Sequence, residues 1–165
     1  MVRFPDRRRT AVAVLVAVAV ATGTLLVPVL SSHIAVARSD RIGVAAPDAS
    51  VLDGGDRVEV TLRVDNPTPR AVRVPEQPSA SGIVLFADGE GNPGDRITDS
   101  RGVEISGATV PAGGTATLTL TLDVVGEYRP IDRESVLGND LGGSLPIEIA
   151  GFETTVGLNA TVGAA

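Results

Sequence analysis

Hydrophobic and polar residues alternate along RVEVTLRVD, the segment from Arg57 to Asp65. Valine or leucine occupies every second position from residue 58 to residue 64, and charged or hydroxyl-bearing residues stand between them. A period of two is typical of a β-strand with one face buried and the other in water. Asn66-Pro67 follows; asparagine bonds its local backbone and proline presets a turn. We therefore predict a strand that ends in a structural corner at Asn66 and Pro67.

The same alternation recurs along the rest of the chain. The segment TATLTLTLDV, from Thr115 to Val124, places leucine and valine on one face and threonine and aspartate on the other. Gly- and Pro-rich turns separate these strands from shorter alternating stretches, which lie at 42–46, 71–75, 83–87, 103–105, 147–149 and 156–162. This pattern predicts an all-β, antiparallel immunoglobulin/fibronectin III-like β-sandwich. One short helix is expected at 131–141, with Asp132 as its N-cap and Gly138 near its end.

The first third of the chain has a different composition. Residues 11–30 are almost wholly Ala, Val and Leu, and Arg7, Arg8 and Arg9 stand immediately before them. A run of about 20 apolar residues can cross a bilayer as a helix, and the arginines keep the N-terminus in the cytoplasm. We predict a basic cytoplasmic N-terminus at 1–10, a transmembrane helix at 11–34, a stalk at 35–42 and an exported domain at 43–165.

A cleavable signal peptide is the alternative for this segment. Ala35-Val36-Ala37 offers a small-x-small cleavage site, and cleavage near Ala37 would release a secreted protein. The apolar run is long for a signal peptide, so its length favours a single-pass anchor. Both alternatives place the domain outside the cytoplasm.

The exported part is strongly acidic. From Arg38 onward the chain has ten arginines against nineteen Asp and Glu residues, a net charge of −9, and no lysine. Such a domain repels nucleic acid and anionic lipid headgroups, so we expect no nucleic-acid partner. Net acidity keeps a protein soluble in concentrated salt, which favours a salt-adapted prokaryote. A GC-rich coding sequence would produce the same bias toward arginine.

The residues needed for common catalytic chemistry are largely missing. His33, the only histidine, stands in the N-terminal segment, and the chain has neither cysteine nor lysine. A Ser-His-acid triad in the domain, thiol and Schiff-base chemistry, and a His/Cys zinc site are therefore excluded. Carboxylates alone remain, without the aromatic residues that usually line a glycosidase cleft. We predict a non-enzymatic protein without a cofactor.

Two weaker site patterns occur in the domain. Oxygen ligands at positions 1, 3, 5 and 12 of the loop at 88–99 resemble a calcium loop; these are Asp88, Glu90, Asn92 and Asp99. However, Pro93 stands where that loop needs glycine, so a solvated hairpin loop is favoured. Asn159-Ala160-Thr161 matches a glycosylation acceptor.

Three short segments together suggest a family. LRVDNP at 62–67, VPAGGT at 110–115 and LPIEIAG at 145–151 resemble, in this order, the WHy domain of the late embryogenesis abundant (LEA) type 2 proteins. The resemblance extends over residues 43–163, although Arg70 and Arg73 stand where that family usually continues apolar or aromatic. Together with the acidic composition, it leads us to expect a salt-adapted archaeal member.

The resemblance implies a non-enzymatic role in desiccation or osmotic stress, for a domain held to the membrane by its N-terminal helix. The alternative is an envelope protein-binding module or accessory subunit, because a sandwich can bind a partner protein through its loops or an edge strand. An exported hydrolase acting through carboxylates is a distant third possibility.

Overall fold

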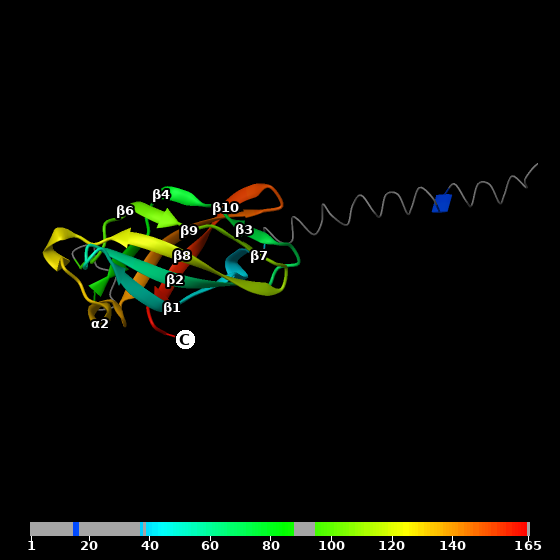
Figure 1. The fold of residues 1–165 in the computed structure, drawn as a ribbon. Coiled ribbons are helices and arrows are strands. Elements are labelled where there is room, and N and C mark those ends of the chain that lie inside the picture. Colours follow the sequence, from blue (N-terminus) through cyan, green and yellow to red (C-terminus); the bar gives the residue numbers. More distant parts are fainter. Residues whose placement is uncertain (1–14, 17–36, 38, 88–94, 165) are drawn as a thin grey trace, which may run out of the picture.

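The computed structural model describes residues 15–16, 37, 39–87 and 95–164, and it shows two antiparallel β-sheets facing one another (Figure 1). The predicted all-β sandwich with a short helix is confirmed. In chain order the elements are η1 (Ser39–Arg41), β1 (Gly43–Leu52), β2 (Arg57–Asn66), β3 (Val72–Val74), β4 (Gln77–Ser81), β5 (Val84–Phe86), β6 (Arg101–Ile105), β7 (Ala108–Val110), β8 (Gly114–Asp123), η3 (Gly126–Tyr128), α2 (Arg133–Val136), β9 (Asp140–Ile149) and β10 (Phe152–Thr161).

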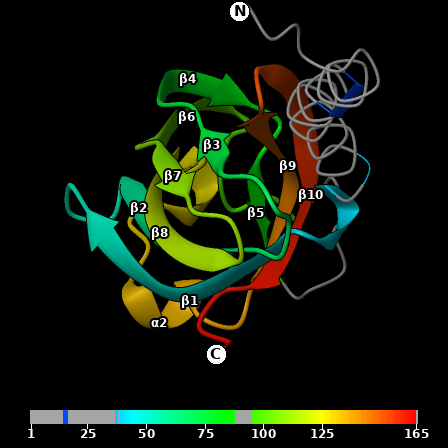
Figure 2. The same ribbon diagram turned by 90° about the vertical axis from the view of Figure 1, so that its right-hand side faces the viewer.

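The strand order explains how the two sheets meet. The first sheet has the order β1-β2-β8-β6-β4, and the second has the order β10-β9-β3-β7 with β5 also paired to β9 (Figure 2). At one side the sheets close on each other, because Ala46 of β1 bridges Val162 and its carbonyl accepts from the Gly163 N–H at 2.7 Å. The turn η1 lies against β10 near this side.

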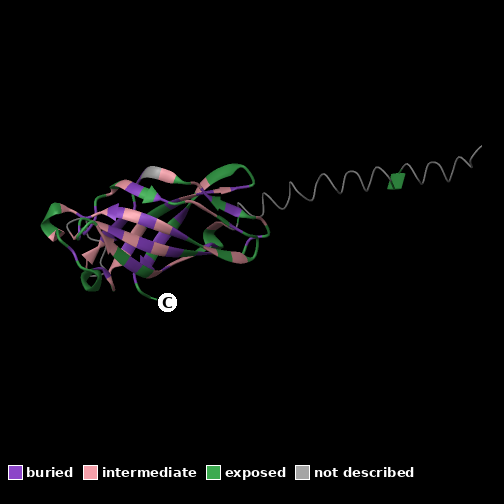
Figure 3. Cartoon of the chain, viewed as in Figure 1, coloured by how far each residue is buried: buried purple, intermediate pink, exposed green. Residues whose placement is uncertain are grey.

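The core contains the predicted alternating residues. The inward positions of β2 and β8 are buried while the positions between them are exposed or half-buried, which produces the chequered colouring of Figure 3. Burying one such aliphatic side chain contributes about 1.5–3 kcal/mol. The buried positions predicted for the longest strands are Val58, Val60, Leu62 and Val64, then Leu118, Leu120, Leu122 and Val124, and finally Val156, Leu158, Ala160 and Val162.

The predicted helix is much shorter than expected. Asp132 is its N-cap, as predicted, because its carboxylate accepts from the Ser135 N–H at 2.8 Å. However, α2 ends at Val136, and Gly138 has a positive φ of 87°. Residues 140–149 form β9, which pairs with β10 along its whole length. Sheet pairing and burial in the core outweigh the weak helical preference of this segment.

Three other strand predictions need correction. The first strand, expected at 42–46, extends over 43–52, with an irregularity between Ala45 and Asp48 that accommodates Pro47. No strand was expected between 75 and 83, yet residues 77–81 form β4, where Pro78 is tolerated because β4 is the last strand of its sheet. The alternation expected at 83–87 is wrong, since Val84 is buried together with its neighbours.

The N-terminal predictions lie almost wholly outside the described residues, including the anchor at 11–34 and the cleavage site. No helix in the part of the chain that the structure describes is both long and apolar enough to span a membrane. Ile42, the last residue of the predicted stalk, is buried in the core.

Asn66 joins three segments at the end of β2. Its side chain is fully buried, and its Nδ2 donates to the carbonyls of Arg70 at 2.8 Å, Pro111 at 2.9 Å and Val110 at 3.3 Å. Its Oδ1 accepts from the N–H and the hydroxyl of Thr68, at 3.1 and 2.7 Å. The amide therefore connects the corner after β2 to the turn between β7 and β8. Pro67 is exposed beside it.

Replacing Asn66 tests this corner. Asn66→Ala leaves the buried Thr68 N–H without its acceptor and removes one donor from each of three carbonyls, and an unsatisfied buried group costs about 1–3 kcal/mol. We expect the free energy of unfolding, measured by chemical denaturation, to fall by about 3 kcal/mol. Asn159→Ala, on the exposed face of β10, is the control and should change it by less than about 0.5 kcal/mol. Equal effects of the two substitutions would contradict the role of the corner.

Candidate functional site

A groove of about 430 Å³ lies on the outer face of the second sheet, where the chain crosses from β3 to β4. Pro75 and Pro146 contribute apolar surface to it, and Arg73, Glu148 and Glu153 contribute charges. Glu148 points outward because its neighbours along β9 point into the core. The volume lies within the range of about 300–1,000 Å³ of small-molecule sites.

The hairpin between β9 and β10 determines the charges in this groove. Ala150 and Gly151 both have a positive φ, 53° and 84°, as in a two-residue type I′ turn. The resulting register places Glu148 directly opposite Glu153, while Arg73 of β3 pairs with Glu148 from the other side. The Arg73 Nη1 lies 3.4 Å from the Glu148 Oε2. Arg73, Glu148 and Glu153 thus lie side by side, with two carboxylates and one guanidinium. Like charges directly opposite one another are destabilising.

Two smaller hollows adjoin the groove. One, of about 320 Å³, shares Gln77 with it, and the other, of about 200 Å³, shares Arg73. Glu76 lines both smaller hollows. We call this combined area the crossover surface, defined by Arg73, Glu76, Gln77, Glu104, Glu148 and Glu153. Arg73 is the one basic residue among these, so the crossover surface is acidic.

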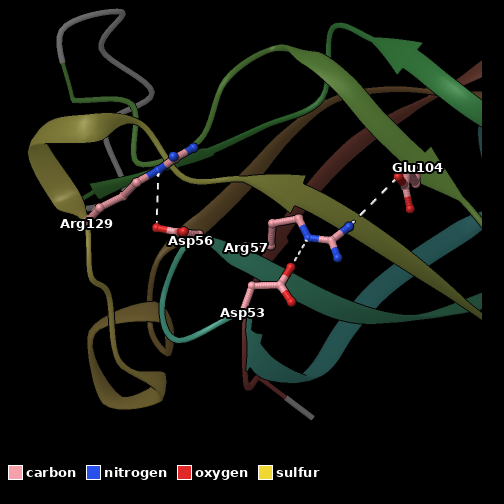
Figure 4. A network of polar contacts seen from close by, with 5 residues as sticks. All are labelled: Asp53, Asp56, Arg57, Glu104 and Arg129. Carbon is pink, nitrogen blue, oxygen red and sulfur yellow. Dashed lines mark hydrogen bonds and ion pairs between the residues drawn. The ribbon is translucent and has the colours of Figure 1, made fainter.

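A second group of charges holds turns together (Figure 4). Arg57 forms an ion pair with Asp53, and its Nη1 lies 3.9 Å from the Glu104 Oε1. The Arg129 Nε lies 3.9 Å from the Asp56 Oδ1. The hydrogen bond from Arg57 to Asp53 raises the pKa of the guanidinium. These pairs are exposed and contribute little to stability individually. They connect the loop between β1 and β2 to β6 and to the segment that follows η3.

The calcium prediction is mostly outside the described residues. Asp88, Glu90 and Asn92 lie there, and Asp99 is the one candidate that the structure places. Its Oδ1 accepts from the Arg101 N–H at 3.1 Å. Among the described residues, no group of three His, Cys, Asp or Glu side chains could hold a metal ion.

Asn159 lies in the middle of β10 and is exposed. It pairs with Gly142 of β9. The hydroxyl of Thr161, two residues on, donates to the Asp140 carboxylate at 2.7 Å. The acceptor pattern is therefore on a strand rather than in a loop.

Little in the sequence points to the crossover surface. Its glutamates come from three separate parts of the chain, and each one alone is typical of a solvated position. The two-residue turn Ala150-Gly151 was the one usable signal, because a two-residue hairpin loop fixes which residues face one another. That signal predicts the pairing of Glu148 with Glu153, but not the proximity of Arg73 or Glu76.

Comparison with known proteins gives no family for the chain. No family model matches it, and no curated protein does. Among solved structures, the PapD-like domain 7 of human CEP192 is 12% identical over 76% of this chain and 87% of that chain, with a TM-score of 0.33. The apo PCuAC domain of PmoF2 is 15% identical over 75% and 92%, with a TM-score of 0.36. A FixG-related protein from Vibrio parahaemolyticus is 12% identical over 74% and 95%, with a TM-score of 0.30. These similarities carry no argument about function.

One carboxylate, that of Asp48, fastens α2 to the sandwich, and another, that of Asp132, caps the helix. Asp48 accepts from the Arg133 Nη2 at 2.6 Å, and this hydrogen bond lowers the pKa of Asp48. Arg133 also donates from Nε to the Ala49 carbonyl at 2.9 Å. The backbone hydrogen bond from Ser135 lowers the pKa of Asp132. Both groups are therefore better stabilised as anions in the folded chain than in the unfolded chain.

The sign of the pH dependence follows from these shifts. A carboxylate whose pKa is lowered by folding contributes stability above its unfolded pKa, about 3.9, and loses it as the pH falls through its folded pKa. We expect Asp48→Ala combined with Asp132→Ala to lower the thermal midpoint at pH 7, and the difference from the unmodified chain to shrink below about pH 4. Asp65→Asn, an exposed control on β2, should leave the midpoint unchanged. A difference that grows on acidification would contradict the assignment.

Proposed function

We propose that this chain is a non-enzymatic, LEA type 2-like domain that protects against desiccation or osmotic stress. The observation that carries the proposal is the outer face of the first sheet. On β8, Thr117, Thr119 and Thr121 alternate with buried leucines, and on the neighbouring β2, Arg63 and Asp65 alternate with buried residues. Hydroxyl and charged groups on a continuous sheet face keep that face hydrated.

The composition supports the same proposal. The net charge of −9 from Arg38 onward keeps a protein solvated where salt is concentrated. The core needs no disulfide and, among the described residues, no buried side-chain N or O atom lacks a hydrogen-bond partner.

The proposal includes a location and a family. The domain is an immunoglobulin/fibronectin III-like sandwich of the LEA type 2 kind, from a salt-adapted archaeon. A single transmembrane helix at 11–34 holds it outside the cell, with the N-terminus in the cytoplasm. The apolar run after Arg7, Arg8 and Arg9 supports this arrangement.

A deletion strain tests the stress role. We expect the strain to grow normally in its usual medium and to recover more slowly after drying or an abrupt change of salt concentration, because the protective domain is missing. Growth after the shock is the measurement, and the gene restored in full is the control. Unchanged recovery in the deletion strain would contradict the proposal.

External protease applied to intact cells that carry a C-terminal tag checks the location.

A second candidate function is an envelope protein-binding module or accessory subunit. The crossover surface favours it, because a groove with apolar surface from Pro75 and Pro146 and a charged rim is typical of a recognition site. Covalent crosslinking in intact cells followed by purification of the tagged chain is the test. We expect one stoichiometric companion protein, and a strain carrying the tag alone is the control. A purification that yields no companion above this control would contradict the module.

A further inference from the structure

We propose that the crossover surface binds an extended, basic segment of a partner protein. This inference rests on the second proposed function, the binding module. It goes further in assigning the surface that binds and the chemistry of the segment that is bound.

The shape of the surface favours a linear segment. The main groove shares Gln77 with one smaller hollow and Arg73 with the other, and Glu76 lines both smaller hollows, so three hollows adjoin around the crossing from β3 to β4. Pro75 and Pro146 give the main groove apolar surface. A chain lying in such a hollow can bury apolar side chains there and keep charged side chains at the rim.

The neighbouring strand can pair with an extended chain. β4 is the last strand of the first sheet and lines the groove through Gln77, and both views place it beside the hairpin of β9 and β10 (Figures 1 and 2). A terminal strand presents main-chain donors and acceptors to an added strand, although Pro78 contributes no donor and the pairing of β4 with β6 is irregular between Gln77 and Ser81. The other sheet ends offer less: within the described residues, β1 bridges Val162, β10 has η1 against it, and β7 spans only Ala108–Val110.

The charges determine which segment fits. Glu76, Glu148 and Glu153 line the surface with one guanidinium among them, that of Arg73 beside Glu148, while Glu104 also lies near Arg57, which is outside the surface. Glu148 and Glu153 repel each other across the strands, and an incoming ammonium or guanidinium group relieves this repulsion. In an extended chain, alternate side chains point to the same side. The bound segment therefore carries Lys or Arg at alternate positions.

The binding test uses the full-length chain in detergent and a fluorescein-labelled ten-residue peptide of alternating lysine and valine. Fluorescence anisotropy should show saturable binding, and an alternating glutamate and valine peptide should not bind. Glu148→Gln combined with Glu153→Gln should weaken binding about ten-fold, and Arg73→Gln should strengthen it several-fold. Thermal unfolding of each variant verifies that it is folded.

A matched variant separates this site from general attraction to an acidic protein. Glu59→Gln combined with Asp65→Asn removes the same charge from the outer face of the first sheet. It should change the affinity less than two-fold, and a loss equal to that caused by Glu148→Gln combined with Glu153→Gln would overturn the proposal.

A peptide N-methylated at alternate residues tests the strand pairing. It should bind more weakly, since it cannot complete a strand ladder, and equal binding would overturn strand addition. If no basic peptide binds while crosslinking still captures a companion, the inference fails and the binding module stands.

Discussion

Aliphatic side chains at alternate positions of β2, β8, β9 and β10 fill the space between the two sheets, and the other features of the molecule depend on this burial. The chain has no cysteine and very few aromatic residues, so neither disulfides nor large ring systems contribute to the core. The largest fully buried side chains are leucine, isoleucine and valine. Because branched aliphatic residues occupy the inner positions, the charged groups are confined to the outer positions and the turns, and the buried hydroxyls of Thr68 and Thr98 are hydrogen-bonded. The core thus determines where any surface chemistry can lie.

Asn66 is the informative exception to an aliphatic core. At the corner after β2 the backbone leaves the sheet, and the carbonyls of Arg70, Val110 and Pro111 lie within reach of the Asn66 side chain. A buried amide donates to all three, whereas an aliphatic side chain could not. At a second crossing, from β6 to β7, the backbone passes too close to Glu76 for any residue other than Gly107. Its φ is 69°, and a Cβ there would lie 2.8 Å from the Glu76 main-chain nitrogen. Where the chain passes from one sheet to the other, single residues such as Asn66 and Gly107 determine the structure, and the alternation of buried and exposed residues does not.

This difference explains which elements could be predicted from the sequence. β2, β8 and β10 alternate over many residues and bury one face, so their pattern identified them. β4 was missed because Pro78 argues against a strand unless the strand is known to be terminal, and that is a property of the assembled sheet. The predicted helix was too long because Asp140 to Leu145 has little alternation of its own and becomes a strand through pairing with β10. Asp132 was predictable as the N-cap because capping depends on adjacent residues alone.

The candidate site could not be predicted from the pattern of neighbouring residues in the sequence. The carboxylates of the crossover surface come from the β3–β4 crossing and from β6, β9 and β10, and each occupies an outer position that the core leaves free for any polar residue. Nothing in the burial of the core requires two glutamates to face each other at Glu148 and Glu153. A threonine opposite Glu148 would pack as well and avoid the repulsion. The chain therefore carries an electrostatic cost at this place that its fold does not explain, and a basic partner would offset that cost.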